Sequence, residues 1–337
     1  MTSPLLVAEL SGNHNGKLDR ALALVDSAAT AGAHAIKIQT YTADTLTIDA
    51  DLPAFRVKSD HGLWGDRHLH DLYEEAHTPW NWHAPIFERA RERGLIPFST
   101  PFDPTSIEFL EGLNVQLYKT ASAEIVDLPL IREIGRTGKP LIVSTGIATL
   151  SEIEDALNAA REGGATDITL LVATAAYPAS PQEARLGNLE VLRSAFGLPV
   201  GLSDHTLGIG TALTAVALGA SVIEKHFTLN RADGGVDAAF SAEPEEFRQL
   251  AQAVPDVVAA ANSGVRFGPT PGEDAVLRLR RSLYVVEDVK RGDTVTTHNV
   301  RSIRPAGGLP ADAISLVVGR TFTSNAVRGT PLTWEII

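Results

Sequence analysis

Two histidines each stand just past a short apolar run, and their spacing suggests shared chemistry. His205 lies in GLSDHTLG and His226 in SVIEKHF, with a segment typical of one helix between them. Parallel strands joined by a helix can lie side by side, about 4.8 Å apart, so both imidazoles could contact one cation. We expect the reaction chemistry of this protein to take place at these two histidines.

The neighbours of the pair narrow the choice of cation. Asp204 and Glu224 lie beside the two histidines, and the chain contains no cysteine. A single histidine at a strand end is more often structural, but two beside acidic residues favour a metal site with nitrogen and oxygen ligands. We expect a divalent metal, with Mn2+ ahead of Mg2+ or Co2+, and zinc in an open catalytic site as a further alternative.

Two lysines, Lys37 and Lys119, predict a site for a phosphate or a carboxylate. Hydroxyl groups nearby could add directional hydrogen bonds to the point charges of the lysines. These hydroxyl residues are Thr100, Ser122, Ser144 and Ser203. In the alternative interpretations, the lysines extend to the rim of the fold or one of them forms a Schiff base, as in aldolases.

The elements that position these residues follow from hydrophobic patterns. Short apolar runs predict eight strands, at 5–10, 35–40, 95–100, 116–121, 140–145, 168–174, 198–203 and 221–227. Apolar residues at helical spacing separate most of them. Buried strands with helical crossovers imply a parallel sheet, and eight such units predict an α/β fold, a closed (β/α)8 TIM barrel. An open doubly wound sheet is the competing fold.

Helix boundaries can also be predicted from the sequence. Gly32, Gly94 and Gly138 stand where helices should end. Ser151, followed three residues later by Glu154, has the pattern of a capping box at a helix start.

The polar residues at the strand ends favour the barrel over the open sheet. A barrel brings the carboxyl ends of all its strands to one mouth, which is the usual active-site face. The polar residues at or just past these ends are Glu9, Lys37, Gln39, Thr100, Lys119, Ser122, Ser144, Tyr177, Ser203, His205, Glu224 and His226.

The pattern changes after the predicted barrel domain, residues 1–262. Residues 263–281 are rich in glycine and proline and are typical of a linker. Residues 282–337 contain short β-type runs broken by RGD and RGT turns, which predicts a small β-rich domain. A domain of this size is marginally stable alone, so we expect it to pack on something.

Composition limits the partners. The net charge is −12 over 337 residues, which argues against a nucleic-acid surface. The N-terminus lacks the pattern of a secretory leader, and no run of 18 apolar residues occurs. We expect a soluble, cytoplasmic protein without a membrane partner.

Several strings together resemble a known family. AELSGNHNG, AIKIQTY, FSTPFD, YKTASAEIVDLPLI, IVSTGIATLSEIE, GLSDHTLG, GASVIEKHF and RSIRPAGG are similar to the sialic acid synthase family. Members condense phosphoenolpyruvate with an N-acetylated sugar to form a nonulosonic acid. The final segment resembles the antifreeze-like (SAF) domain of that family. Residues 59–83 and DGGVDAAFS are most similar to the branch that makes pseudaminic acid, which implies 2,4-diacetamido-2,4,6-trideoxy-altrose as the sugar.

The resemblance also implies roles for individual residues. It implies that phosphoenolpyruvate is held by Lys37, Thr100, Lys119, Ser122, Ser144 and Ser203, and the metal by His205 and His226. It implies that the sugar is faced by Glu9, Gln39, Glu124, Tyr177 and Asp237. Glu9 or Glu124 is then the expected general base. Arg304 matches an arginine that reaches from one subunit into the barrel of the other, which implies a domain-swapped homodimer.

Two departures from the family pattern and three rival interpretations stay open. Ala175 replaces an asparagine, and Val236 replaces a proline in the loop after the last barrel strand. The nearest rival is a legionaminic or neuraminic acid synthase. A more distant one is a Schiff-base aldolase using Lys119 or Lys225. The third is a non-enzymatic carbohydrate- or ice-binding protein.

Overall fold

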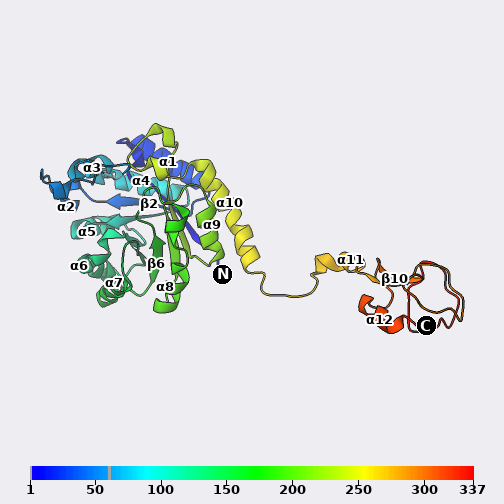
Figure 1. The fold of residues 1–337 in the computed structure, drawn as a ribbon. Helices are drawn as coiled ribbons and strands as arrows, with labels where there is room; N and C mark the ends of the chain where they lie inside the picture. Colours follow the sequence, from blue (N-terminus) through cyan, green and yellow to red (C-terminus); the bar gives the residue numbers. More distant parts are fainter. Residues whose placement is uncertain (1, 60–61) are drawn as a thin grey trace. The chain divides into compact units, whose positions relative to one another are not determined.

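The computed structural model describes residues 2–59 and 62–337 (Figure 1). The chain divides into two compact units, one ending at Ser263 and the other beginning at Gly264. Each unit has a hydrophobic core of its own. Among the described residues, no helix combines the length and the apolar character needed to cross a bilayer.

The first unit is built on a closed parallel barrel. Its strands, in spatial as well as chain order, are β1 Leu5–Glu9, β2 Ala35–Thr40, β3 Ile96–Pro101, β4 Tyr118–Thr120, β5 Leu141–Ser144, β6 Ile168–Ala173, β7 Val200–Asp204 and β8 Val222–His226. The barrel closes because β1 pairs with β8, with Glu9 opposite His226. This confirms the predicted barrel and excludes the open sheet.

Helices cover the outside of the barrel (Figure 1). The helices of this unit are α1 Leu18–Thr30, α2 Ala43–Leu46, α3 Leu69–Ala76, α4 Trp80–Glu92, α5 Pro104–Gly112, α6 Leu128–Arg136, α7 Leu150–Gly163, α8 Asn188–Phe196, α9 Gly210–Ala217 and α10 Pro244–Ala261. Short 3-10 turns occupy loops: η1 Ser11–His14, η2 Pro53–Phe55, η3 Ala123–Val126, η4 Pro181–Ala184, η5 Arg231–Asp233 and η6 Ala238–Phe240.

Helix ends agree with the sequence at some positions and not at others. Gly32, Gly94 and Gly138 follow helices with φ of 91°, 75° and 67°, as expected for glycines that end helices. The predicted capping box was placed wrongly. Helix α7 begins two residues earlier, and its box joins Thr149 and Glu152. Both pairs have the required spacing, and the upstream pair caps the helix because the chain already turns into it at Leu150.

The inside of the barrel has an apolar half and a polar half. Side chains alternate along each strand, so every second residue points inward. The lower inward layer is a separate apolar cluster of Val7, Ala35, Phe98, Ile142, Leu171 and Val222. Two residues further along five of these six strands, the inward residues are polar, namely Glu9, Lys37, Thr100, Ser144 and Glu224, all buried; on β6 the corresponding residue is Ala173.

The second unit is small and β-rich. Strands β9 Ser282–Val285 and β10 Val300–Ile303 pair antiparallel, and short helices α11 Asp274–Leu277 and α12 Ile314–Val317 and turns η7 Pro271–Glu273 and η8 Ala311–Ala313 complete it. Gly292 of the RGD turn and Gly329 of the RGT turn have φ of 97° and 94°, which glycine adopts readily. Its core includes Leu283, Val295 and Phe322.

Candidate active site

A buried cluster of charges fills the barrel just above its apolar layer. The Lys37 ammonium lies 2.5 Å from Glu9 Oε2 and 3.4 Å from Glu224 Oε1. The Lys119 ammonium lies 3.5 Å from the same Glu224 oxygen. All four side chains are buried, from strands β1, β2, β4 and β8. We call these four residues the charge cluster.

Hydroxyl groups surround the charge cluster. Lys37 donates to Thr100 Oγ1 at 3.4 Å, and Ser203 Oγ donates to Glu224 Oε1 at 3.4 Å. Ser144 Oγ is buried and has no hydrogen-bond partner within the described chain. A buried polar group without a partner is costly, so an unpaired hydroxyl beside two lysines points to a ligand that completes it.

Burial and mutual attraction set the charges in the cluster. Burial raises the pKa of Glu9, and Lys37 only partly opposes this. Burial lowers the pKa of Lys119 despite the nearby carboxylate of Glu224. For Glu224 itself, burial is outweighed by Lys119 and Lys37, which hold its pKa below the usual value. The cluster therefore combines two lysines with carboxyl groups whose pKa values are shifted in opposite directions, an arrangement suited to proton transfer.

The two histidines lie side by side at the mouth, with ring centroids 5.2 Å apart. The Nδ1 of His205 lies 2.6 Å from the Thr174 carbonyl oxygen, which can only accept, so Nδ1 carries the proton and Nε2 is free. Burial lowers the pKa of His205 to about 4 and that of His226 well below its usual value. Both imidazoles are neutral at pH 7, as metal ligands must be.

The donor set fits a divalent cation with open positions. His226 Nδ1 is buried without a hydrogen-bond partner in the described chain, and Asp237 Oδ2 lies 3.9 Å from it. Within residues 2–59 and 62–337, no group of three His, Asp or Glu residues forms a complete metal site. Two imidazoles would therefore hold a cation only together with water or substrate, which is the arrangement of a catalytic site.

Polar residues from three loops and strands surround the histidines. Ser11 Oγ donates to Asp237 Oδ2 and accepts from the Gln39 amide at 3.3 Å. Burial raises the pKa of Asp237. The Tyr177 ring lies 4.5 Å from that of His205, and burial raises its pKa to about 12, so Tyr177 stays a neutral hydroxyl.

The remaining predicted residues lie less centrally. Ser122 and Glu124 are half-buried at turn η3, after β4. Burial raises the pKa of Glu124, while Lys119 lowers it. Arg304 lies in the second unit, exposed just past β10. The structure therefore brings all the predicted barrel residues to one mouth, and Arg304 belongs to the other unit.

Sequence reasoning named Glu224 beside the histidines and among the polar strand ends, but it gave this residue no role in the site. The alternation in SVIEKHF could have found it, because Glu224 and His226 share the inward parity of Val222. The same rule turns Lys225 outward. Lys225 is buried there and donates to Asp204 Oδ2 at 2.7 Å and to the Thr206 carbonyl at 2.8 Å.

The two departures from the family pattern have different surroundings. Ala175 is exposed, at the loop after β6. Val236 follows Gly234 and Gly235, and its loop is tied at several points. Its carbonyl accepts from the Trp64 indole at 2.9 Å, and the Asn15 amide donates to the Gly234 carbonyl at 3.1 Å. The loop is therefore held in place without the proline.

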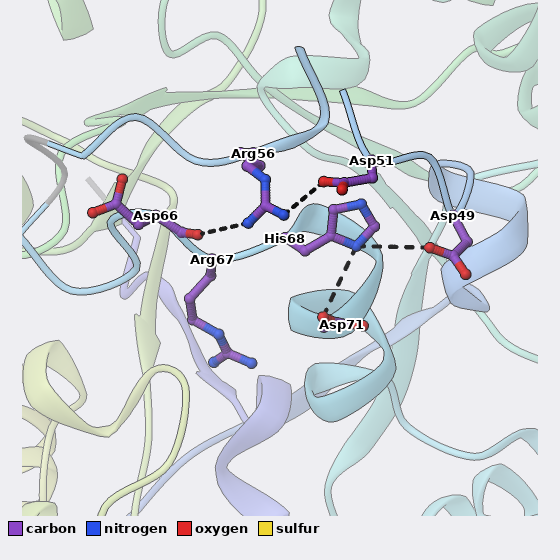
Figure 2. Close-up of a pocket in the computed structure, with 7 residues that line it drawn as sticks. All are labelled: Asp49, Asp51, Arg56, Asp66, Arg67, His68 and Asp71. Atoms are coloured by element: carbon purple, nitrogen blue, oxygen red, sulfur yellow. Dashed lines mark hydrogen bonds and ion pairs between the residues drawn. The ribbon is translucent and has the colours of Figure 1, made fainter. Parts of the chain in front are cut away.

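Apart from the barrel mouth, a hollow of about 480 Å3 lies over the segment between β2 and α3 (Figure 2). Arg56 pairs with Asp51 at 2.7 Å, and His68 Nδ1 lies 3.9 Å from Asp49 and from Asp71. No predicted site residue lines this hollow. Its charges face one another, and they hold this segment in shape rather than forming a second reaction site.

Comparisons with known proteins match both units. Residues 24–266 match the NeuB family, and residues 280–336 match the SAF domain. The pseudaminic acid synthase of Helicobacter pylori is 39% identical, over 99% of this chain and 98% of that protein. The N,N'-diacetyllegionaminic acid synthase of Campylobacter jejuni is 35% identical, over 96% of this chain and 97% of that protein.

A solved structure shows the same barrel. The N-acetylneuraminic acid (sialic acid) synthetase of Leptospira borgpetersenii, solved in complex with citrate, is 30% identical to this chain. It superposes with a TM-score of 0.72, over 82% of this chain and 90% of that one.

Proposed function

Because this chain belongs to the NeuB family, we propose that it is a pseudaminic acid synthase. It condenses phosphoenolpyruvate with 2,4-diacetamido-2,4,6-trideoxy-L-altrose and water, and it releases phosphate. The charge cluster directly below the neutral histidine pair is the observation that supports the proposal, because buried lysines suit an anion and neutral imidazoles suit a cation.

The charge cluster and its hydroxyls hold phosphoenolpyruvate. Lys37 and Lys119 neutralise its phosphate and carboxylate, and they remain available throughout the reaction. Directional hydrogen bonds come from Thr100, Ser122, Ser144 and Ser203. Ser144 supports this assignment most directly, because its buried hydroxyl has no partner in the described chain.

The reaction then needs one new carbon–carbon bond and one broken carbon–oxygen bond. C3 of phosphoenolpyruvate attacks the aldehyde carbon of the open-chain sugar, and water adds at C2 before phosphate leaves from that carbon. Glu9 takes the proton of the water, with Glu124 as the other candidate base, because burial raises the pKa of each toward neutrality. His205 and His226 would hold a divalent cation, Mn2+ by preference, which would supply Lewis-acid polarisation of the aldehyde oxygen. Gln39, Tyr177 and Asp237 orient the sugar.

The test is phosphate release from phosphoenolpyruvate with a panel of candidate sugars. The panel contains the altro sugar, its legionaminic-type epimer and N-acetylmannosamine, each with and without chelator. We expect chelator-sensitive release with the altro sugar and a product that co-migrates with authentic pseudaminic acid. A preference for the epimer would favour the legionaminic alternative, which the relative from Campylobacter jejuni supports. A borohydride-trapped adduct with pyruvate would favour the Schiff-base alternative.

We also propose that the enzyme works in the cytoplasm as a domain-swapped homodimer in which Arg304 of one subunit serves the barrel of the other. The exposed position of Arg304 just past β10 supports this assignment. Arg304→Ala should raise the KM for the sugar more than that for phosphoenolpyruvate. Mixing Arg304→Ala with His226→Ala subunits should restore part of the activity, since each hybrid dimer holds one complete site. If the mixed subunits were no more active than the two variants measured separately, the exchange of Arg304 between subunits would be contradicted.

A further inference from the structure

A cavity of about 270 Å3 opens beside the histidine pair and is lined by side chains of two kinds. Its polar lining includes Ser11, Gln39, Asp237 and His226. Its apolar lining, which we call the wall, includes Val57, Trp64, Leu69 and the ring of Tyr73, all from the segment between β2 and α4. A ligand that fills this cavity therefore meets both polar groups and apolar surface.

The ring of Phe240 connects the histidines to the wall. The His226 ring lies 4.8 Å from that of Phe240, and the Phe240 ring lies 6.4 Å from that of Trp64. Trp64 also packs on Tyr177, with ring centroids 5.5 Å apart. In the proposed reaction the sugar aldehyde lies at His226, so the far end of the sugar chain reaches Trp64.

Trp64 is held in this position by a hydrogen bond to another loop and by backbone hydrogen bonds that join the two ends of its own segment. Its indole donates to the Val236 carbonyl at 2.9 Å, which joins the segment to the loop after β8. Backbone hydrogen bonds connect Val57 with Arg67 and Asp66, and the ion pair of Arg56 with Asp51 lies on the outer side (Figure 2). The half-buried indole is therefore a preorganised surface and not a core residue.

We propose that Trp64 determines the specificity of the site for a sugar whose far end carries methyl groups instead of hydroxyls. This inference rests on the proposed function. A 6-deoxy sugar with an N-acetyl group offers methyls to the wall, whereas a hydroxylated chain would lose its water against Val57, Leu69 and the face of the Trp64 ring without gaining a hydrogen bond from them. Apolar pockets of this kind discriminate by roughly 10–100-fold.

The experiment measures kcat/KM for the 6-deoxy altro sugar and for N-acetylmannosamine, with the full-length enzyme. Trp64→Ala should lower the value for the deoxy sugar roughly 10–100-fold and leave that for N-acetylmannosamine within about 3-fold. The KM for phosphoenolpyruvate should not change. Trp64→Phe, which keeps an aromatic ring but removes the indole donor, should keep most of the preference.

Two further variants keep the test independent of folding. Leu63→Ala is the matched control, because Leu63 is on the same segment but does not line the cavity, and the preference should not change. Val57→Thr adds one hydroxyl to the wall at nearly constant volume and should narrow the preference in favour of N-acetylmannosamine. If neither Trp64→Ala nor Val57→Thr changed the ratio of kcat/KM between the two sugars, the inference about Trp64 would be overturned while the proposed function would stand. If the wild-type enzyme used neither sugar, the proposed function would fall with it.

Discussion

The inner and outer faces of the barrel strands both bury a lysine beside a carboxylate, but they complete the pair differently. On the outer face, Lys225 has two oxygen partners, and Asp204 Oδ1 also accepts from the Thr206 backbone and hydroxyl. On the inner face, Glu224 Oε2 has no partner in the described chain. The outer pair is a complete structural contact, whereas the inner cluster keeps a buried carboxylate oxygen unpaired within the described chain.

Burial does not separate the two faces, since Lys37 and Lys225 are both almost fully buried. The buried atoms without a hydrogen-bond partner in the described chain include Ser144 Oγ and His226 Nδ1 on the inner face, but also Thr120 Oγ1 on the outer face. Because a protein leaves few buried polar groups unpaired, the atoms on the inner face support its assignment as the reactive face.

The largest expected effect is on the inner face. His226→Ala should reduce turnover roughly 1,000-fold or more, equivalent to about 4 kcal/mol of transition-state stabilisation. Phosphate release in buffer supplemented with metal measures it. His70→Ala is the matched control, since His70 lies on α3 and pairs only with Asp44. Undiminished activity of His226→Ala would contradict the metal assignment.

On the outer face, Lys225→Met should destabilise the protein by about 3–5 kcal/mol, because it leaves Asp204 charged and buried. Urea unfolding measures the loss. Adding Asp204→Asn should recover part of the stability, and the folded fraction should keep its KM for phosphoenolpyruvate. If Lys225→Met instead changed that KM selectively, the division between the two faces would be wrong.

Ser144→Ala should raise the KM for phosphoenolpyruvate about 10-fold, equivalent to about 1.4 kcal/mol, with little change for the sugar. The free energy of unfolding should stay the same or rise slightly, since the hydroxyl has no partner in the described chain to lose. Steady-state kinetics and urea unfolding on one preparation separate these effects. A loss of stability with an unchanged KM would identify Ser144 as a structural residue.

The smallest expected effect concerns His83, which is buried outside the barrel and whose Nε2 lies 2.8 Å from the Thr40 hydroxyl. Burial lowers its pKa from 6.5 to about 4. Between these values only the unfolded chain binds the proton, so its contribution to stability is full above pH 6.5 and falls as the pH falls toward 4. His83→Gln should reduce the pH dependence of unfolding by up to about 1.4 kcal/mol per pH unit. An unchanged slope would show that His83 titrates normally in the folded protein.

The barrel could be predicted because its strands are continuous apolar runs with polar ends, and the resemblance to the family added the residue roles. The same runs did not show that Glu224 lies inside the charge cluster, because this depends on which of the alternating side chains of β8 point into the barrel. The Trp64 wall could not be predicted either. Val57 and Trp64 lie in the irregular stretch before α3, which has no periodicity, and the Trp64 indole is held by a hydrogen bond to a residue 172 positions away.

Along strand β8, side chains that point into the barrel alternate with side chains that point outward. This alternation restricts how the length of the strand can change. Deleting Ile223 from Val222–His226 would exchange the inward and outward sets, placing Lys225 where the Glu224 carboxylate stands and Phe227 where the His226 imidazole stands. Deleting two would keep the sets but draw the imidazole roughly 6.6 Å down the strand, away from its partner on β7. Both sets of β8 are buried, so changes in chain length should be confined to the loops that follow.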